Sequence, residues 1–344
     1  MKVVFQGAGA IGVAAAALFG KRHEAVVVSR SVNSAPSAAH SPDTAHSPDT
    51  AHSPDTAQFP DTAQFPDTAH SRDAAYPRQV GSFGKGSVRR VPVVDWAAVS
   101  SDSWDLVVLS TRPGDLDDSV AASIVSLRPS IIAITSQVDG DQEIAGSMFP
   151  DSEILVFSPA LLSERTTGRD VRYWQPPGMP VFMASGRRET VGGLRRELGG
   201  LIVGVPAAMV SGPPAVFIPY VAELTIREGS WAELRTHLRR PAQASAEAVH
   251  AVTGIRVPMS ARIAGLVLDA LERFVPIDVS EYAGRHFGRH EGQTRDMLAG
   301  WIAREAERAP ALREPTARRS RASTTAQSPA LRELAQALRL RVTR

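Results

Sequence analysis

The residues with the clearest chemical use are three glycines near the start of the chain, in the run GAGAIG at 7–12. In a dinucleotide fold the first glycine allows a tight turn, the second lets the backbone approach a pyrophosphate, and the third lets a helix pack closely on a strand. The free N–H groups of that helix would face the phosphates. The predicted cofactor-binding residues of this turn are Gly7, Ala8, Gly9, Ala10, Ile11 and Gly12.

The segments around these glycines must position them. An apolar run at 2–6 reads as a strand, an alanine-rich segment after the glycines reads as a helix, and Glu24 to Val28 reads as a second strand. A lone GxGxxG is a weak signal, and its alternative is an ordinary glycine-containing turn between strand and helix. The order strand, glycine turn, helix and strand favours the nucleotide interpretation.

The second strand ends at Ser29 and Arg30, where dinucleotide folds read the adenosine ribose. An acidic residue there would bind a free 2′-hydroxyl and repel a 2′-phosphate, whereas a hydroxyl and an arginine suit the phosphate. The pattern favours NADP over NAD. The alternative is a solvated arginine at a strand end.

The composition excludes several classes of protein. The chain has 344 residues, 43% of them hydrophobic, no cysteine and a formal net charge of +2. We therefore expect two domains, no disulfide or thiolate metal site, and no electrostatic case for nucleic acid. The glycine turn interrupts the apolar start, and no apolar run approaches the roughly 20 residues of a membrane span. We expect a soluble, cytoplasmic protein that does not bind membranes.

A hexapeptide repeats between Ala39 and Ala74: AHSPDT three times, AQFPDT twice, and a degraded copy. A proline every six residues prevents a helix, and the polar residues around it bury little surface. We expect a disordered insert at about 35–78, in a surface loop of the first domain. Its histidines could form a metal-binding tract, but few other ligands accompany them, so we predict no metal site.

Strands and helices alternate after the insert. The expected strands are 88–94, 105–110, 131–135, 154–157 and 181–184, with a helix over 115–127. This alternation is typical of a parallel sheet with helices on both faces. We predict an α/β fold: a Rossmann-type, doubly wound parallel sheet over residues 1–205.

Helical patterns dominate from residue 206 onward. The expected helices are 216–238, 242–253, 259–274 and 290–306, which predicts an all-helical domain over 206–308 for substrate binding and dimerisation. Pro219 must kink the first of these helices or mark its start. Residues 309–344 read as a basic, largely flexible tail with a short terminal helix. A nucleic-acid role for its arginine cluster at 318–321 is the less favoured alternative.

The glycine turn, the second strand ending in Arg30, and the run DLVVLSTR at 105–112 followed by Asp115-Leu116 resemble the ketopantoate reductase (2-dehydropantoate 2-reductase) family. The resemblance implies a Rossmann domain followed by a helical domain, NADP, a small 2-oxo acid substrate and a homodimer. It also implies that Arg112 stands where the family has a lysine near the 2′-phosphate. Arg30 and Arg112 would then hold one phosphate.

The resemblance implies further that Gln137 stands in place of an asparagine near nicotinamide and substrate. The family's proton donor is a lysine on the first long helix of the second domain, but the only lysines here are Lys2, Lys21 and Lys85. Near residue 294 the family's substrate-binding glutamate is replaced by Arg295. The catalytic residues are therefore unassigned, and the substrate is expected to differ from ketopantoate.

Five side chains in the second domain could still move a proton. His286 and His290 lie four residues apart with Glu291 beside them, although a polar helix face is the favoured interpretation and no third zinc ligand is evident. Tyr220 and Glu223 are the other candidates.

The leading hypothesis is an NADP-dependent oxidoreductase of ketopantoate reductase type that reduces a small 2-oxo acid or related carbonyl between its two domains. One alternative is a catalytically inactive, NADP-binding regulatory protein. Another is an enzyme of opine-dehydrogenase type.

Overall fold

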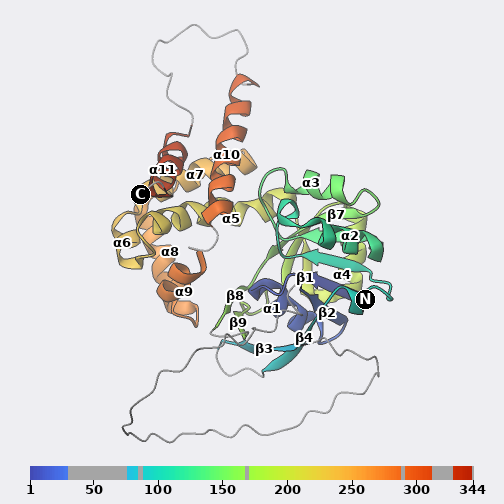
Figure 1. Cartoon of the computed structure of the whole chain (residues 1–344). Helices are drawn as coiled ribbons and strands as arrows, with labels where there is room; N and C mark the ends of the chain where they lie inside the picture. Colours follow the sequence, from blue (N-terminus) through green and yellow to red (C-terminus); the bar gives the residue numbers. More distant parts are fainter. Residues whose placement is uncertain (30–75, 84–87, 167–169, 288–290, 312–327, 343–344) are drawn as a thin grey trace, which may run out of the picture.

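The computed structural model describes the chain apart from residues 30–75, 84–87, 167–169, 288–290, 312–327 and 343–344. A sheet covered by helices forms the first part, and a group of helices forms the second, with helix α5 (Ala207–Ile226) leading from one to the other (Figure 1). The hexapeptide repeats and the arginine cluster at 318–321 lie outside the described residues.

One sheet of eleven strands runs through the first part, in the order β11-β10-β7-β6-β5-β1-β2-β4-β3-β9-β8. Its centre is parallel, because β4, β2, β1, β5, β6 and β7 all pair in the same direction. These strands are β1 (Lys2–Gln6), β2 (Glu24–Val28), β4 (Arg89–Val94), β5 (Leu106–Leu109), β6 (Ile131–Ile134) and β7 (Glu153–Pro159). The parallel Rossmann-type centre that the sequence predicts is confirmed.

The two sides of this sheet depart from a purely parallel arrangement. On one side β10 (Phe182–Ser185) is antiparallel to β7, and β11 (Ile202–Gly204) follows it in parallel. On the other side β3 (Tyr76–Ser82) is antiparallel to β4 and carries β9 (Val171–Trp174) and β8 (Leu162–Arg165). The insert expected to reach residue 78 therefore overlaps the start of β3.

Side chains that alternate along the strands pack into two separate cores, one on each face of the sheet. Val3 and Phe5 pack with α1 (Ala10–Phe19) and α4 (Arg188–Leu198), whereas Val4 packs with α2 (Asp118–Leu127) and α3 (Asp141–Met148). Short 3₁₀ turns lie at η1 (Ala97–Val99), η2 (Pro113–Asp115) and η3 (Gly199–Leu201). Both faces of the sheet are thus covered, and its strand ends carry the loops in which ligands bind in such folds.

The second part of the chain is helical. After α5 come α6 (Trp231–Thr236), α7 (Arg239–Thr253), α8 (Ala261–Phe274), α9 (Val279–Phe287), α10 (Glu291–Ala311) and α11 (Pro329–Val342). Helix α5 packs against α7, α10 and α11. By length and composition α5 could cross a membrane, yet half of its apolar window is buried inside the protein, which is also the pattern of a core helix.

One expectation for this part needs correction, and one of the two alternatives for Pro219 is removed. The helix expected at 216–238 is two helices, because Glu228 (φ 56°) and Gly229 (φ 79°) adopt left-handed backbone conformations between α5 and α6. Helix α5 also starts at Ala207 and contains Pro219, so this proline does not mark its start.

The terminal helix expected at the end of the tail is α11, and it packs into the helical core. In α11 the side chains of Leu331, Leu334 and Leu338 are fully buried, and they pack into the same core as Leu298 and Trp301 of α10. Their spacing of three and four residues places them on one helix face. The last helix is therefore part of the helical core, because removing this apolar face from water lowers the free energy of the folded chain.

Candidate functional site

The glycine turn has the geometry of a dinucleotide cradle. Gly7 has φ 95°, a left-handed conformation that favours glycine, and its N–H donates to the carbonyl oxygen of Val28 at 2.9 Å. A β-carbon at Gly12 would lie 2.5 Å from the carbonyl oxygen of Gly7, whereas a β-carbon at Gly9 would meet no atom within 4 Å. The turn is closed where helix and strand pack and open where a pyrophosphate would lie.

The start of α1 offers hydrogen-bond donors to that open side. Gly9 is the N-cap residue and provides no side-chain cap, and no described side chain is seen to hydrogen-bond the first-turn N–H groups of Ala10 to Gly12. Ser110 anchors the turn from β5, because its hydroxyl donates to the carbonyl oxygen of Gln6 at 2.6 Å. Backbone donors and the positive end of the helix dipole together make an anion site.

The predicted ribose-reading residues follow β2. Ser29 lies next to this turn, and its N–H donates to the carbonyl oxygen of Val94 at 3.1 Å. Arg30 lies outside the described residues. The register of β1 and β2 places the end of β2 beside the glycine turn, since Gln6 pairs with Val28.

Arg112 binds two carboxylates of the protein itself. Its guanidinium lies 3.0 Å from the buried carboxylate of Asp141 in α3 and 2.5 Å from Asp296 in α10. The hydrogen bond with Asp141 raises the pKa of Arg112 above its usual value. In this arrangement Arg112 joins the sheet to the helical part, and its charge is already balanced without a phosphate.

Gln137 lies in the loop after β6, at the carboxyl end of the parallel strands. Its amide nitrogen donates to the hydroxyl of Ser158 at 2.7 Å, and its buried amide oxygen has no hydrogen-bond partner in the part of the chain that the structure describes. A buried acceptor without a donor is costly, so this oxygen is suited to a ligand donor. The neighbouring Val138 packs into the helical core with Trp301.

A second ion pair holds the same loop against α10. Asp139 binds Arg304, and a β-carbon at Gly300 would lie 2.7 Å from the Asp139 carboxylate. This contact and the one between Arg112 and Asp296 bring α10 onto the carboxyl edge of the sheet. Sequence reasoning missed both, because nothing local in a sequence indicates which distant carboxylate an arginine will bind.

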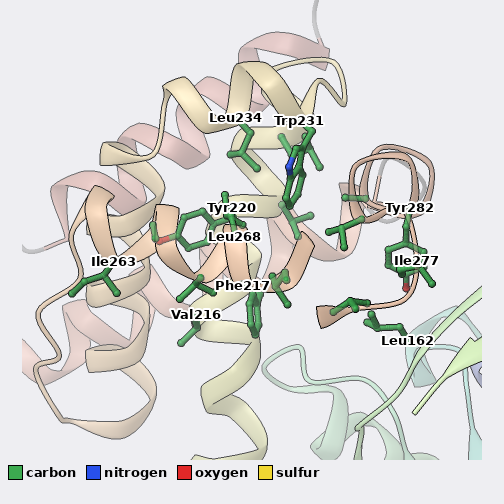
Figure 2. Close-up of a pocket in the computed structure, with 18 of the residues that line it drawn as sticks. Leu162, Val216, Phe217, Tyr220, Trp231, Leu234, Ile263, Leu268, Ile277 and Tyr282 are labelled. Carbon is green, nitrogen blue, oxygen red and sulfur yellow. The ribbon is translucent and has the colours of Figure 1, made fainter. Parts of the chain in front are cut away.

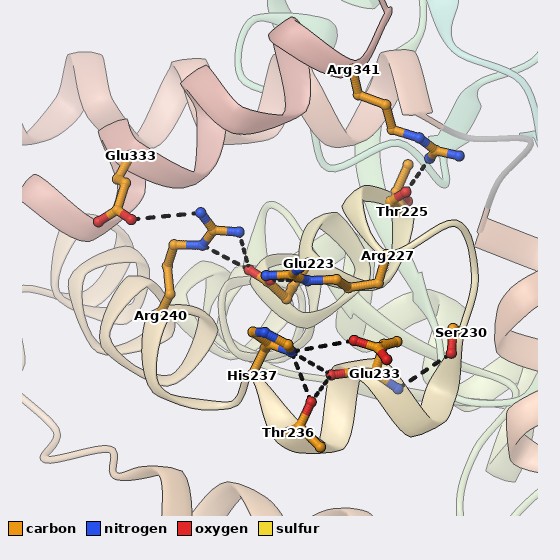
Figure 3. Close-up of polar contacts among 10 residues, drawn as sticks. All are labelled: Glu223, Thr225, Arg227, Ser230, Glu233, Thr236, His237, Arg240, Glu333 and Arg341. Carbon is orange, nitrogen blue, oxygen red and sulfur yellow. Dashed lines mark hydrogen bonds and ion pairs between the residues drawn. The ribbon is translucent and has the colours of Figure 1, made fainter.

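Glu223 on α5 is not placed to donate a proton to a substrate. Its side chain is 1% exposed and binds Arg227 at 3.0 Å and Arg240 at 2.6 Å, while Arg240 also reaches Glu333 of α11 (Figure 3). The pair of arginines stabilises the ionised carboxylate and connects α5 to α7. Burial raises the pKa of the other α5 candidate, Tyr220, to about 12.

The candidates near residue 290 are described only in part. His286 belongs to α9, but its side chain and all of His290 lie outside the described residues. Glu291 starts α10 and lies 3.8 Å from Arg295. Among the described residues no group of three or more histidine, aspartate or glutamate side chains is placed to hold a metal ion.

Two hollows border these elements. An apolar pocket of about 280 Å³ lies within the helical part (Figure 2). A wider cleft of about 860 Å³ is lined by α4, the start of α5 and Arg304 of α10, and its lining includes Arg188 and Arg195 but no carboxylate among the described residues.

The chain resembles known proteins in its structure and not in its sequence. No protein-family model matches the sequence, and no curated protein is similar to it in sequence. Solved structures do match. A dimeric ketopantoate reductase from Staphylococcus aureus has a TM-score of 0.62 at 11% identity, covering 99% of this chain and 98% of that one.

Two further solved structures are similar to this chain over nearly its whole length. A 2-dehydropantoate 2-reductase from Geobacter metallireducens has a TM-score of 0.57 at 13% identity, covering 99% of this chain and 100% of that one. D-mandelate dehydrogenase in a ternary structure with NADH and anilino(oxo)acetate has a TM-score of 0.59 at 10% identity, covering 99% and 97%. The chain therefore has the fold of the ketopantoate reductases along nearly its whole length.

Proposed function

We propose that the protein is an NADPH-dependent oxidoreductase that reduces a small 2-oxo acid or related carbonyl. The observation that carries the proposal is the contrast between Gly12, packed against Gly7, and Gly9, whose outer side is open. A purely structural turn needs glycine at Gly7 for its backbone conformation and at Gly12 for packing, but not at Gly9. An open glycine beside uncapped helix N–H groups suits the close approach of a pyrophosphate.

Different residues of the chain would bind different parts of the cofactor. The N–H groups of Ala10, Ile11 and Gly12 would hold the pyrophosphate, and Ser29 with Arg30 would select the 2′-phosphate. The unpaired amide oxygen of Gln137 would accept a hydrogen bond from the nicotinamide or the substrate. Because Arg112 binds Asp141 and Asp296, we assign the phosphate to Arg30 and treat Arg112 as a contact between the two parts of the chain.

A bound reduced nicotinamide supplies the hydride, and with one proton the 2-oxo acid becomes a 2-hydroxy acid. Ketopantoate reductase and an NADH-bound D-mandelate dehydrogenase share the fold, which supports a nicotinamide cofactor and a 2-oxo acid. The dimeric neighbour supports a homodimer. A cytoplasmic location remains a prediction.

A second candidate is an NADP-binding protein without catalysis. It is favoured by the engagement of Glu223 with two arginines, and by α5 having no lysine. A missing general acid commonly costs a factor of about 10²–10⁴ in rate. Turnover distinguishes the two candidates, since both require the nucleotide.

The test of cofactor choice compares Arg30→Glu with Arg22→Glu, an exposed arginine that receives the same change of charge. We expect Arg30→Glu to weaken NADPH binding at least tenfold more than NADH binding, measured by fluorescence titration. Arg22→Glu should leave the ratio unchanged. Equal losses for both nucleotides would remove the 2′-phosphate assignment. Oxidation of NADPH across a panel of 2-oxo acids then tests catalysis.

A further inference from the structure

The apolar pocket in the helical part is built as a binding site for an apolar group. Side chains from α5, α6, α8 and α9 surround it, among them Phe217 and Trp231 (Figure 2), and the loops before and after α8 add Met259 and Ile277. Apolar pockets of this kind gain affinity in proportion to the apolar surface that a ligand buries.

Of the three polar tips in its wall, two are used by the protein, and the third, the buried hydroxyl of Tyr220, has no hydrogen-bond partner among the described residues. The indole N–H of Trp231 donates to Glu272, and the hydroxyl of Tyr282 donates to the carbonyl oxygen of Ser163 at 3.3 Å. A hydroxyl or charged group inside this pocket would therefore find few hydrogen-bond partners, which costs free energy. The wall selects against polar substituents as well as for apolar ones.

The pocket reaches the loop that carries Gln137: its wall residue Val216 packs against the core that holds Val138, the residue after Gln137. One wall residue, Leu162, begins strand β8, close after the end of β7 at Pro159. Strand β8 packs against α1, the helix that follows the glycine turn. Figure 2 shows Leu162 facing Ile277 and Tyr282 across the junction of the two parts.

Its size points to a small molecule. A dry apolar cavity of about 150 Å³ is enough to bind benzene, so about 280 Å³ holds a ring with a substituent or a chain of several carbons. An α-helix about 10 Å across with its side chains would not fit.

We propose, on the basis of the function proposed above, that the substrate is a 2-oxo acid with a large apolar side chain that occupies this pocket. The side chain is aromatic or a hydrocarbon chain of several carbons. Each added methylene should raise kcat/KM about fourfold until the pocket is full. A hydroxylated side chain of equal size should be disfavoured by up to about 10²-fold.

The first experiment needs no cofactor. Binding of unreactive carboxylates from butanoate to octanoate is measured by calorimetry on the full chain. We expect octanoate to bind at least tenfold more tightly than butanoate. Phe217→Ala, a half-exposed wall residue, should weaken octanoate binding about tenfold, whereas Phe274→Ala, an exposed phenylalanine outside the pocket, should not. Equal affinity along the series, or equal effects of the two variants, would overturn the proposal.

The second experiment measures NADPH oxidation with 2-oxo acids of increasing side-chain length. Turnover that does not depend on the side chain would refute the apolar pocket while leaving the reductase function standing. Absence of nucleotide binding would refute the reductase function, and the carboxylate series would still report on the pocket.

Discussion

Gly12 lies so close to Gly7 that a β-carbon there would be 2.5 Å from the Gly7 carbonyl oxygen, a contact that real β-carbons do not make. Because the obstacle is backbone, Gly12→Ala must displace the start of α1 from the end of β1. We expect a loss of about 1–3 kcal/mol in the free energy of unfolding, together with lost NADPH binding. Urea unfolding followed by circular dichroism measures the first. A variant as stable as the wild type would contradict the packing.

Gly9→Ala should separate binding from folding. Gly9 has φ −73°, which alanine accepts, and its β-carbon would meet no protein atom. We expect the free energy of unfolding to stay within about 0.5 kcal/mol while NADPH affinity falls at least tenfold. Gly146→Ala, at an equally open position in helix α3 and outside the turn, is the matched control. Unchanged affinity in Gly9→Ala would argue for a purely structural turn.

Arg112→Ala should be a stability variant. It leaves the carboxylate of Asp141, 1% exposed, without its guanidinium partner, which should cost about 2–4 kcal/mol of unfolding free energy. Asp296→Asn removes the exposed half of the same contact and should cost less than about 1 kcal/mol. If Arg112 instead binds the 2′-phosphate, Arg112→Ala would lower NADPH affinity and leave stability near that of the wild type.

Glu223→Gln tests the candidate acid on α5. Loss of the buried carboxylate leaves Arg227 without its carboxylate partner and Arg240 with the exposed Glu333, so we expect a loss of about 2–4 kcal/mol in unfolding free energy. Glu333→Gln, whose exposed side chain also contacts Arg240, should stay within about 1 kcal/mol. A stable Glu223→Gln protein with a specific loss of turnover would restore Glu223 as a proton donor.

Alkaline pH should destabilise the fold through Tyr220. Burial raises its pKa to about 12, above the value near 10 of the unfolded chain, so between these pH values the unfolded state has lost a proton that the folded state keeps. The free energy of unfolding is therefore fully retained below pH 10 and falls by about 2 kcal/mol as pH rises to 12. Urea midpoints at several pH values measure this.

Burial also raises the pKa of Tyr282, so Tyr282 adds to the loss of unfolding free energy at alkaline pH. Tyr220→Phe should flatten the pH dependence without abolishing it. An identical slope in Tyr220→Phe would show that Tyr220 does not contribute.

The local parts of this structure could be predicted from sequence, because they depend on neighbouring residues. Glu24–Val28 is a strand as predicted, and the glycine turn lies between β1 and α1. The strands at the edge were missed: β3 carries Pro77, and β8 and β9 are short and only partly buried, so they show weak apolar alternation.

The site was less predictable, because its contacts join distant residues. Arg112 appears in sequence as a free cation after a strand, and only the fold brings it to Asp141 and Asp296. The apolar pocket is similarly formed by four helices, the loops on either side of α8 and one strand residue, none of which signals a pocket by itself.

Titration of the wild-type protein with NADPH and NADH, followed by fluorescence, tests the central claim most directly. The open side of the glycine turn predicts saturable binding at micromolar concentrations, with NADPH bound more tightly. No saturable binding of either nucleotide at millimolar concentrations would contradict the cradle at Gly7 to Gly12, and with it the proposed function.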